Sequence, residues 1–213
     1  MDRAGETATS GGRPGAGKRA YDPVRMRNRL LDVAAASFQA RGYHATGMHE
    51  IMRMAGVTGG ALYHHFPSKK ALGLAVIRER VARAVTETWI EPLKSARRAG
   101  EGIRTVFAEV AAALEERGSV QGCPLNNLAH ELALADPEFR TALVGVFENW
   151  RIAISEKLRS ERRRDAESLA TMVVATFSGA MSQAKAGQTA APLAACAQQL
   201  LRMLAAGPRK AKR

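Results

Sequence analysis

The stretch GVTGGALYHHF, Gly56 to Phe66, decides the fold of this chain. It follows a short amphipathic run at 48–55, and two short helices joined by a glycine-containing turn are typical of a helix-turn-helix. Thr58 is a suitable N-cap for the second helix, and Pro67 ends that helix. The whole stretch lacks a carboxylate, and glycines at a helix N-terminus let backbone N–H groups approach phosphate closely. The sequence therefore predicts a short helix at about 59–65 that docks on nucleic-acid phosphates.

Residues on both sides of this stretch resemble those of a known family. The segment RGYHAT at 41–46 leads into the 48–55 helix, and LYHHFPSK follows the turn at 62–69. Spacing and residue identity agree over roughly 23–75, and this region resembles the N-terminal DNA-binding domain of the TetR family of bacterial repressors. The segment 122–129 resembles one seen in some subgroups of that family. Elsewhere the resemblance is limited to the number and length of the helices.

The resemblance also implies a set of DNA contacts. Phosphate contacts are implied for Thr58 and Lys69, which stand at the starts of two helices, and for Tyr63 and His64 on the helix between them. The alternatives are that Thr58 only caps its helix and that Lys69 is only solvated. Family members often have a polar residue where this chain has Gly59, so the bases that are read stay open. The predicted DNA-binding residues are Thr46, Thr58, Gly59, Gly60, Tyr63, His64 and Lys69.

Hydrophobic periodicity along the chain predicts an all-α fold of about nine helices. We expect an N-terminal three-helix, helix-turn-helix domain, joined by a long helix at about 68–91 to a C-terminal helical domain that binds an effector and dimerises. The expected boundaries are a disordered basic arm at 1–20, the DNA-binding domain at 21–70, the ligand-binding and dimerisation domain at 71–206, and a basic tail at 207–213.

Charge and cysteine content narrow the class of protein. The net charge is +12, and most of this excess lies before residue 99, which predicts a polyanion-binding N-terminal part on a nearly neutral body. No apolar run approaches the roughly 18 residues of a membrane span, and the N-terminus has no secretory signal pattern. Cys123 and Cys196 are expected to be reduced thiols in the cytoplasm. Adjacent His64 and His65 would point about 100° apart on a helix, so no metal or other cofactor is expected.

The last two predicted helices, 165–186 and 190–205, are poor in charge and rich in small residues. A helix pair that is apolar on more than one face needs more partners than one small domain supplies. We therefore predict a homodimer that forms through these two helices, which also suits a palindromic DNA site. The alternative is an ordinary buried helix pair in a monomer.

The second domain also contains residues suited to bind a small-molecule effector, because ligand sites combine apolar walls with few polar groups and occur between helices of bundles. The alternative for the large apolar residues is plain core. Cys123 has two readings, a reactive thiol that senses oxidants or electrophiles, or a small buried residue. The predicted ligand-binding residues are Phe107, Cys123, Asn126, Asn127, His130, Phe147, Trp150 and Phe177.

Together these features predict a ligand-responsive transcriptional repressor that binds palindromic operator DNA as a dimer and is released by a small-molecule effector. The first alternative is a redox- or electrophile-sensing repressor that acts through Cys123. An enzyme is not expected, because the sequence has no Gly-rich phosphate loop, no paired carboxylates on one predicted face and no nucleophile motif. A third hypothesis, an architectural basic protein, predicts equal affinity for random and operator DNA and needs no neutral C-terminal body of this size.

Overall fold

The computed structural model describes residues 22–205 of the 213-residue chain. The predicted arm at 1–20 and the predicted tail at 207–213 lie outside the described residues. Within 22–205 the secondary structure is helical, with no strand, which confirms the all-α prediction. Among these described residues no helix combines the length and the apolar character that a membrane span requires.

The N-terminal unit consists of α1 (Pro23–Arg41), α2 (Met48–Ala55) and α3 (Gly59–His65). Local signals set its helix ends. The Asp22 carboxylate accepts a hydrogen bond from the Arg25 backbone N–H at 3.0 Å, and α1 ends at Gly42, whose φ of 91° lies where glycine is favoured. The three helices share a core of side chains from each of them. Its members include Leu30, Leu31, Phe38, Ile51 and Leu62.

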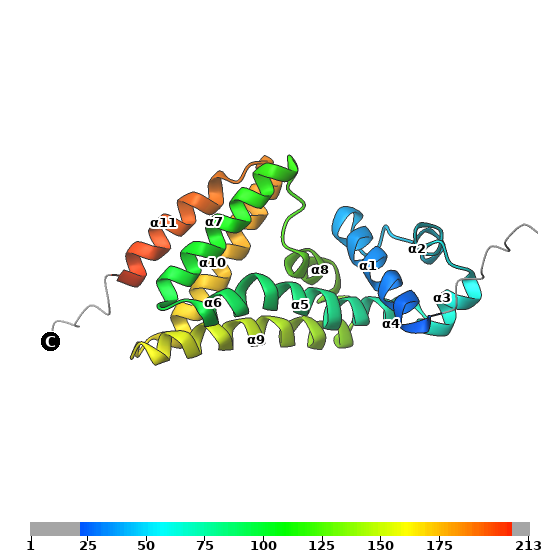
Figure 1. The fold of residues 1–213 in the computed structure, drawn as a ribbon, viewed down its shortest axis with the longest axis horizontal. Helices are drawn as coiled ribbons and strands as arrows, with labels where there is room; N and C mark the ends of the chain where they lie inside the picture. Colours follow the sequence, from blue (N-terminus) through cyan, green and yellow to red (C-terminus); the bar gives the residue numbers. More distant parts are fainter. Residues whose placement is uncertain (1–21, 206–213) are drawn as a thin grey trace, which may run out of the picture.

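One continuous helix, here the long helix, runs from Lys69 to Ser95 and connects this unit with the rest of the chain (Figure 1). It consists of α4 (Lys69–Ala75), a π-helical segment (Val76–Val81), α5 (Ala82–Val85), a second π-helical segment (Thr86–Ile90) and α6 (Glu91–Ser95). The sequence predicted an end near residue 91, before Pro92. The helix instead continues through Pro92. A wide π-helical segment ends at Ile90, two residues before this proline, whose ring would clash with the carbonyl of a regular turn.

The C-terminal body contains α7 (Ala99–Arg117), α8 (Pro124–Leu132), α9 (Pro137–Ser160), α10 (Ala166–Gly187) and α11 (Ala191–Ala205). The long helix and α9 lie alongside one another, and α7, α10 and α11 pack together at the end remote from the N-terminal unit (Figure 1). The short α8 lies between that group and α1. With the long helix counted once, the described residues form nine helices, as the sequence predicts.

A cluster of aromatic rings holds the body together. Trp89 of the long helix lies between Trp150 of α9 and Phe177 of α10, at ring-centroid distances of 5.0 and 4.9 Å. Phe107 of α7 closes the cluster with its centroid 5.3 Å from that of Phe177. Tilted and edge-on rings at these distances attract one another beyond the area they bury. The cluster therefore packs α7, α9 and α10 against the C-terminal half of the long helix.

Candidate nucleic-acid interface and effector cavity

The turn between α2 and α3 has the geometry that the sequence predicts for a helix-turn-helix. Gly56 takes a left-handed conformation with φ 62° and ψ 40°, and its N–H closes the end of α2 on the carbonyls of Met52 and Arg53. Thr58 then caps α3, because its hydroxyl accepts a hydrogen bond from the Ala61 N–H at 3.3 Å. The turn thus ends α2 through a backbone conformation and begins α3 through a side-chain cap.

One side of α3 is buried and the other is open. Leu62, 1% exposed, fixes the helix to the core of the N-terminal unit, whereas Tyr63 is 50% exposed. Thr58, Gly60 and His64 are exposed as well. A Cβ placed on Gly60 would meet nothing within 4 Å, so another molecule can approach this backbone closely. The structure therefore brings these predicted residues to one accessible surface.

Thr46 departs from the predicted set. Its side chain is fully buried, and its hydroxyl donates to the Gly42 carbonyl at 2.8 Å. The hydroxyl is used inside the loop between α1 and α2, so it is not available to a phosphate. This corrects the prediction for Thr46, whose role here is to hold the loop.

Lys69 has a constrained position at the start of the long helix. Its ammonium donates to the His44 carbonyl at 3.2 Å and lies 4.5 Å from the centre of the Tyr43 ring. Burial lowers its pKa, and the carboxylate of Glu131 acts in the opposite direction. The Lys69 side chain is half-buried, and Lys69 follows α3 after the short turn at 66–68.

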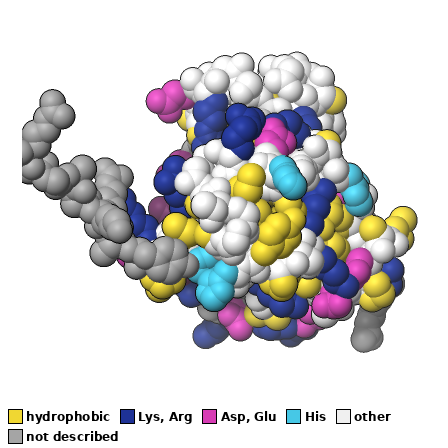
Figure 2. All heavy atoms as spheres, turned by 90° about the vertical axis from the view of Figure 1, so that its right-hand side faces the viewer, with side chains coloured by type: hydrophobic (Ala, Val, Ile, Leu, Met, Phe, Trp, Pro, Cys, Tyr) yellow, Lys and Arg dark blue, Asp and Glu magenta, His cyan; other side chains and the backbone are white. Residues whose placement is uncertain are grey.

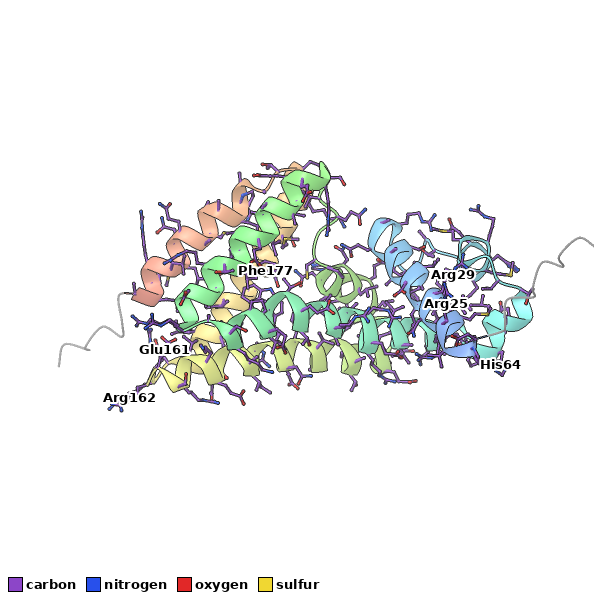
Figure 3. All side chains as sticks on the ribbon, in the orientation of Figure 1. Arg25, Arg29, His64, Glu161, Arg162 and Phe177 are labelled. Carbon is purple, nitrogen blue, oxygen red and sulfur yellow. The ribbon has the colours of Figure 1, made fainter. Side chains whose placement is uncertain are left out.

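Arginines of α1 extend the basic surface beyond the predicted residues. Arg25 and Arg29 are exposed, and Figure 3 shows them on α1 with His64 at the α3 end of the same unit. Arg27, by contrast, is paired with Glu79 of the long helix at 2.5 Å and lies over the Phe66 ring. Figure 2 shows Lys, Arg and His side chains beside hydrophobic groups on this end of the molecule. The sequence signal for Arg25 and Arg29 is their position on the first turns of α1.

The two histidines of α3 are adjacent in sequence. The rings of His64 and His65 are 5.3 Å apart at centroid. Burial lowers the pKa of His65, and the charges of His64 and Arg27 act in the same direction. Across residues 22–205, no group of three or more His, Cys, Asp or Glu side chains is placed to hold a metal ion.

A cavity of about 480 Å³ opens in the body between the long helix and α7. Trp89, Trp150 and Phe177 provide aromatic wall, and the indole N–H groups of the two tryptophans have no acceptor among the described residues. Glu87 of the long helix and Glu109 of α7 also line the cavity. A mostly apolar space of this size, with few polar groups, is typical of a small-molecule site.

The cavity wall includes three of the eight predicted ligand-binding residues, and the other five do not line it. The three are Cys123, Trp150 and Phe177. Phe107 lies behind the wall in the aromatic cluster, and half-buried Phe147 is stacked over Trp150 with centroids 6.5 Å apart.

The polar residues predicted for the cavity lie elsewhere. The Asn126 amide donates to the Ser178 carbonyl at 3.3 Å, Asn127 faces α1 and α10, and His130 is exposed. These positions correct the prediction for the three residues, because spacing along α8 does not reveal which side faces the cavity. The wall residues that the prediction missed come chiefly from the long helix and α7. They are Val81, Ala84, Val85, Glu87, Thr88, Trp89, Glu109, Val110, Ala113, Leu114 and Arg117, together with Gly122, Pro124, Leu125 and Met181.

Cys123 has the surroundings of a structural thiol. It is 8% exposed, and burial raises the pKa of its thiol, with the backbone N–H groups of Asn126 and Leu125 acting in the opposite direction. A sensing cysteine needs a lowered pKa and solvent access. The surroundings of Cys123 provide neither condition.

Comparisons with known proteins agree with this geometry. The family described as bacterial regulatory proteins, tetR family, matches residues 30–76, and the family described as transcriptional regulator LmrA/YxaF-like, C-terminal domain, matches residues 99–199. A crystal structure of a TetR transcriptional regulator from Chloroflexus aurantiacus J-10-FL is 30% identical. It superposes with a TM-score of 0.76 over 86% of this chain and 96% of that chain.

The chain belongs to the TetR family. It is a DNA-binding transcriptional regulator with a helix-turn-helix.

Two further relatives of this TetR-family regulator match most of its length. The uncharacterized HTH-type transcriptional regulator YxaF of Bacillus subtilis (strain 168) is 28% identical over 177 residues, which cover 82% of this chain and 92% of YxaF. The HTH-type transcriptional repressor DhaR of Mycobacterium sp. (strain GP1) is 28% identical over 182 residues, which cover 79% of this chain and 86% of DhaR. The likeness thus includes the body as well as the N-terminal unit.

The two C-terminal helices of this TetR-family regulator present a surface of small side chains. Thr171, Ala175, Gly179 and Ser182 of α10 recur on one exposed side, and a Cβ on Gly179 would meet nothing within 4 Å. On α11, Ala194 and Ala195 are exposed, as is the larger Met203. Small side chains of this kind let two helices approach each other closely, so the surface is suited to helix packing.

Proposed function

We propose that this TetR-family regulator is a dimeric repressor that binds palindromic operator DNA and is released when a small molecule occupies the cavity. The observation that carries the proposal is the course of the long helix. The helix begins at Lys69 beside α3 and provides cavity wall at Val81, Val85 and Trp89. One continuous helix therefore connects the DNA-binding unit with the wall of the cavity.

Docking on DNA would use the exposed side of α3 in a major groove. Thr58, Tyr63 and His64 would meet phosphates, and the open backbone at Gly60 would let α3 approach the duplex closely. The exposed arginines of α1 flank this surface and add positive charge that favours a polyanion.

Dimerisation would pair the small-residue surfaces of α10 and α11 with those of a second copy. A two-fold dimer places two α3 helices on the same side of a duplex, about 34 Å or a multiple of that distance apart. The relative named as a repressor, DhaR, supports repression as the outcome of binding.

Release would follow from a difference in effector affinity between two arrangements of the dimer. An effector that packs against the long helix and α7 would favour the arrangement in which the two α3 helices no longer match the groove spacing. Coupling of this kind is typically about 1–3 kcal/mol.

A DNA-binding titration tests the proposal. Fluorescence anisotropy with duplexes from the region upstream of the gene should give salt-sensitive binding, tight for one palindrome and weak for random duplex. His64→Ala should weaken binding roughly tenfold, since a hydrogen bond to a charged group is lost. The matched control is His130→Ala, because His130 is exposed on α8, away from α3.

Other outcomes identify the competing hypotheses. Equal affinity for random and palindromic duplex would favour an architectural protein. If mild oxidation abolishes DNA binding by the wild-type protein and by Cys196→Ala, but not by Cys123→Ala, the redox-sensing repressor is favoured. Affinity that is independent of salt would exclude phosphate neutralisation as the basis of binding.

A further inference from the structure

The first turn of α8 contains a side chain that bridges three separate parts of the molecule. The Asn127 amide nitrogen donates to Gln39 Oε1 of α1 at 3.2 Å and to the Gln121 carbonyl at 2.8 Å. Its amide oxygen accepts a hydrogen bond from Lys185 Nζ of α10 at 3.1 Å. One side chain thus joins the N-terminal unit, the loop at 118–123 that precedes α8, and a helix with the small-residue surface.

The orientation of this amide follows from its partners. An ammonium group can only donate, so the Asn127 atom facing Lys185 must be the oxygen. The NH₂ group then faces the two oxygens, which use both of its hydrogens. An aspartate of the same shape would keep the contact with Lys185 and lose both donated bonds.

Gln39 of α1 also forms hydrogen bonds directly to the loop at 118–123. Its amide nitrogen donates to the Gly122 carbonyl at 2.7 Å and to the Gln121 carbonyl at 3.3 Å. Gly122 has a φ of +83°, and a Cβ there would lie 2.9 Å from Lys185 Cδ and 3.1 Å from Asn127 Oδ1. The loop is therefore held closely between α1, α8 and α10.

The last turn of α8 is fixed to the N-terminal unit separately. The Glu131 carboxylate accepts hydrogen bonds from the backbone N–H groups of Tyr43 and His44, both at 3.1 Å. Both ends of α8 are therefore tied to the N-terminal unit, and its first turn is also tied to α10.

We propose that Asn127 is a positioning residue that, with Gln39 and Lys185, holds the N-terminal unit at a set angle to α10. The inference rests on the proposed dimeric DNA binding. Because α10 is the proposed dimer helix, this angle determines the separation of the two α3 helices. Asn127 therefore selects the spacing between the two half-sites of the operator, without touching DNA or effector.

The test compares duplexes that differ only in half-site spacing. A palindrome selected from a random pool by the full-length wild-type protein is rebuilt with the spacer lengthened or shortened by one base pair at a time. Wild-type affinity should show one sharp optimum. Asn127→Asp should bind the optimal spacing roughly threefold to tenfold more weakly, as expected for a disrupted hydrogen-bond network. Its affinity for neighbouring spacings and for a single half-site should be unchanged.

Matched variants separate positioning from a general loss. Asn149 is an exposed residue of α9, so Asn149→Asp adds the same charge at a position outside the network. This variant should keep the wild-type dependence of affinity on half-site spacing. Gln39→Ala should flatten the profile as Asn127→Asp does, and the double variant should add little, since both remove one network. Gln39→Ala and Lys185→Met provide the test if Asn127→Asp does not fold.

The remaining outcomes overturn the inference in distinguishable ways. An unchanged spacing profile in the variants means that the junction does not set the angle. A uniform loss at every spacing, including the single half-site, means that Asn127 serves only stability. Failure of the wild-type protein to bind any selected duplex overturns the proposed function, and this inference with it.

Discussion

At the scale of single residues, Thr46 illustrates how a hydroxyl beside a DNA-binding helix can serve the fold alone. Its hydroxyl is buried and donates to the Gly42 carbonyl. Thr46→Val keeps the shape of the side chain and removes the hydroxyl that donates to the Gly42 carbonyl. We expect the free energy of unfolding in urea to fall by about 1–2 kcal/mol, with DNA affinity of the folded protein unchanged. Thr105→Val on exposed α7 is the control. Weaker DNA binding at unchanged stability would restore Thr46 to the contact surface.

The thiol of Cys123 gives a second prediction at this scale. Burial raises its pKa, so fewer thiolates are present at a given pH than for a free cysteine. In a Cys196→Ala background, mass spectrometry can measure the rate at which iodoacetamide alkylates Cys123 over a pH series. We expect this rate to increase at a higher pH in the folded protein than in the urea-unfolded chain. Native alkylation at neutral pH should be slow. Rapid modification there would instead favour a sensing thiol.

At the scale of elements, two glycines of neighbouring helices should respond to alanine in opposite ways. A Cβ on Gly73 of α4 would lie 2.7 Å from Tyr43 Cε2 and 3.0 Å from Phe139 Cε1, where the loop after α1, the long helix and α9 meet. We expect Gly73→Ala to lower the free energy of unfolding by about 1–3 kcal/mol through overpacking.

Gly60→Ala in α3 is the matched substitution, because a Cβ there meets nothing within 4 Å. It should raise the free energy of unfolding by up to about 1 kcal/mol, since the unfolded chain loses freedom. It should also weaken DNA binding, because the methyl group would occupy the close approach between backbone and phosphate. Urea titration and anisotropy measure the two effects, and unchanged DNA affinity would place α3 farther from the duplex.

The scale of elements also shows where local sequence rules succeed. Asp22, Thr58 and Ser68 each cap the helix that they were expected to begin, because capping depends on atoms within three residues. The long helix was predicted to stop before Pro92, and this was wrong. The π-helical segment before Pro92 contains Trp89, which is packed against Trp150 and Phe177, and no local pattern in the sequence predicts those contacts.

At the scale of the whole molecule, the two tryptophans of the chain report on the cavity, since Trp89 and Trp150 both line it. Intrinsic fluorescence can therefore detect any small molecule that binds there. A compound that changes this fluorescence should weaken operator binding, and operator DNA should weaken the binding of that compound by the same factor.

Ala113→Phe, which fills part of the cavity from α7, provides the control. It should reduce the fluorescence response and the release from DNA together, while DNA binding without the compound persists. A compound that binds in the cavity with equal affinity in the presence and absence of operator would contradict coupling between the two sites.

The sequence predicted the residues of the α3 surface better than it predicted the residues of the cavity wall. The exposed residues of α3 lie within one short segment, so their common surface follows from helix geometry. The cavity wall draws on the long helix, α7, α8, α9 and α10, and Asn126, Asn127 and His130 of α8 were wrongly assigned to it. Which side of so short a helix faces inward depends on the helices packed around it.

By itself, the sequence determined the helices, most of their ends and the helix-turn-helix, because hydrogen bonding within a few residues and hydrophobic periodicity govern these features. Only the tertiary structure decided that Thr46 is buried, that Cys123 is shielded, and that Asn127 lies between α1 and α10. These outcomes depend on contacts between residues far apart in the chain. The angle between the N-terminal unit and α10 belongs to this second group, since side chains from separate helices set it.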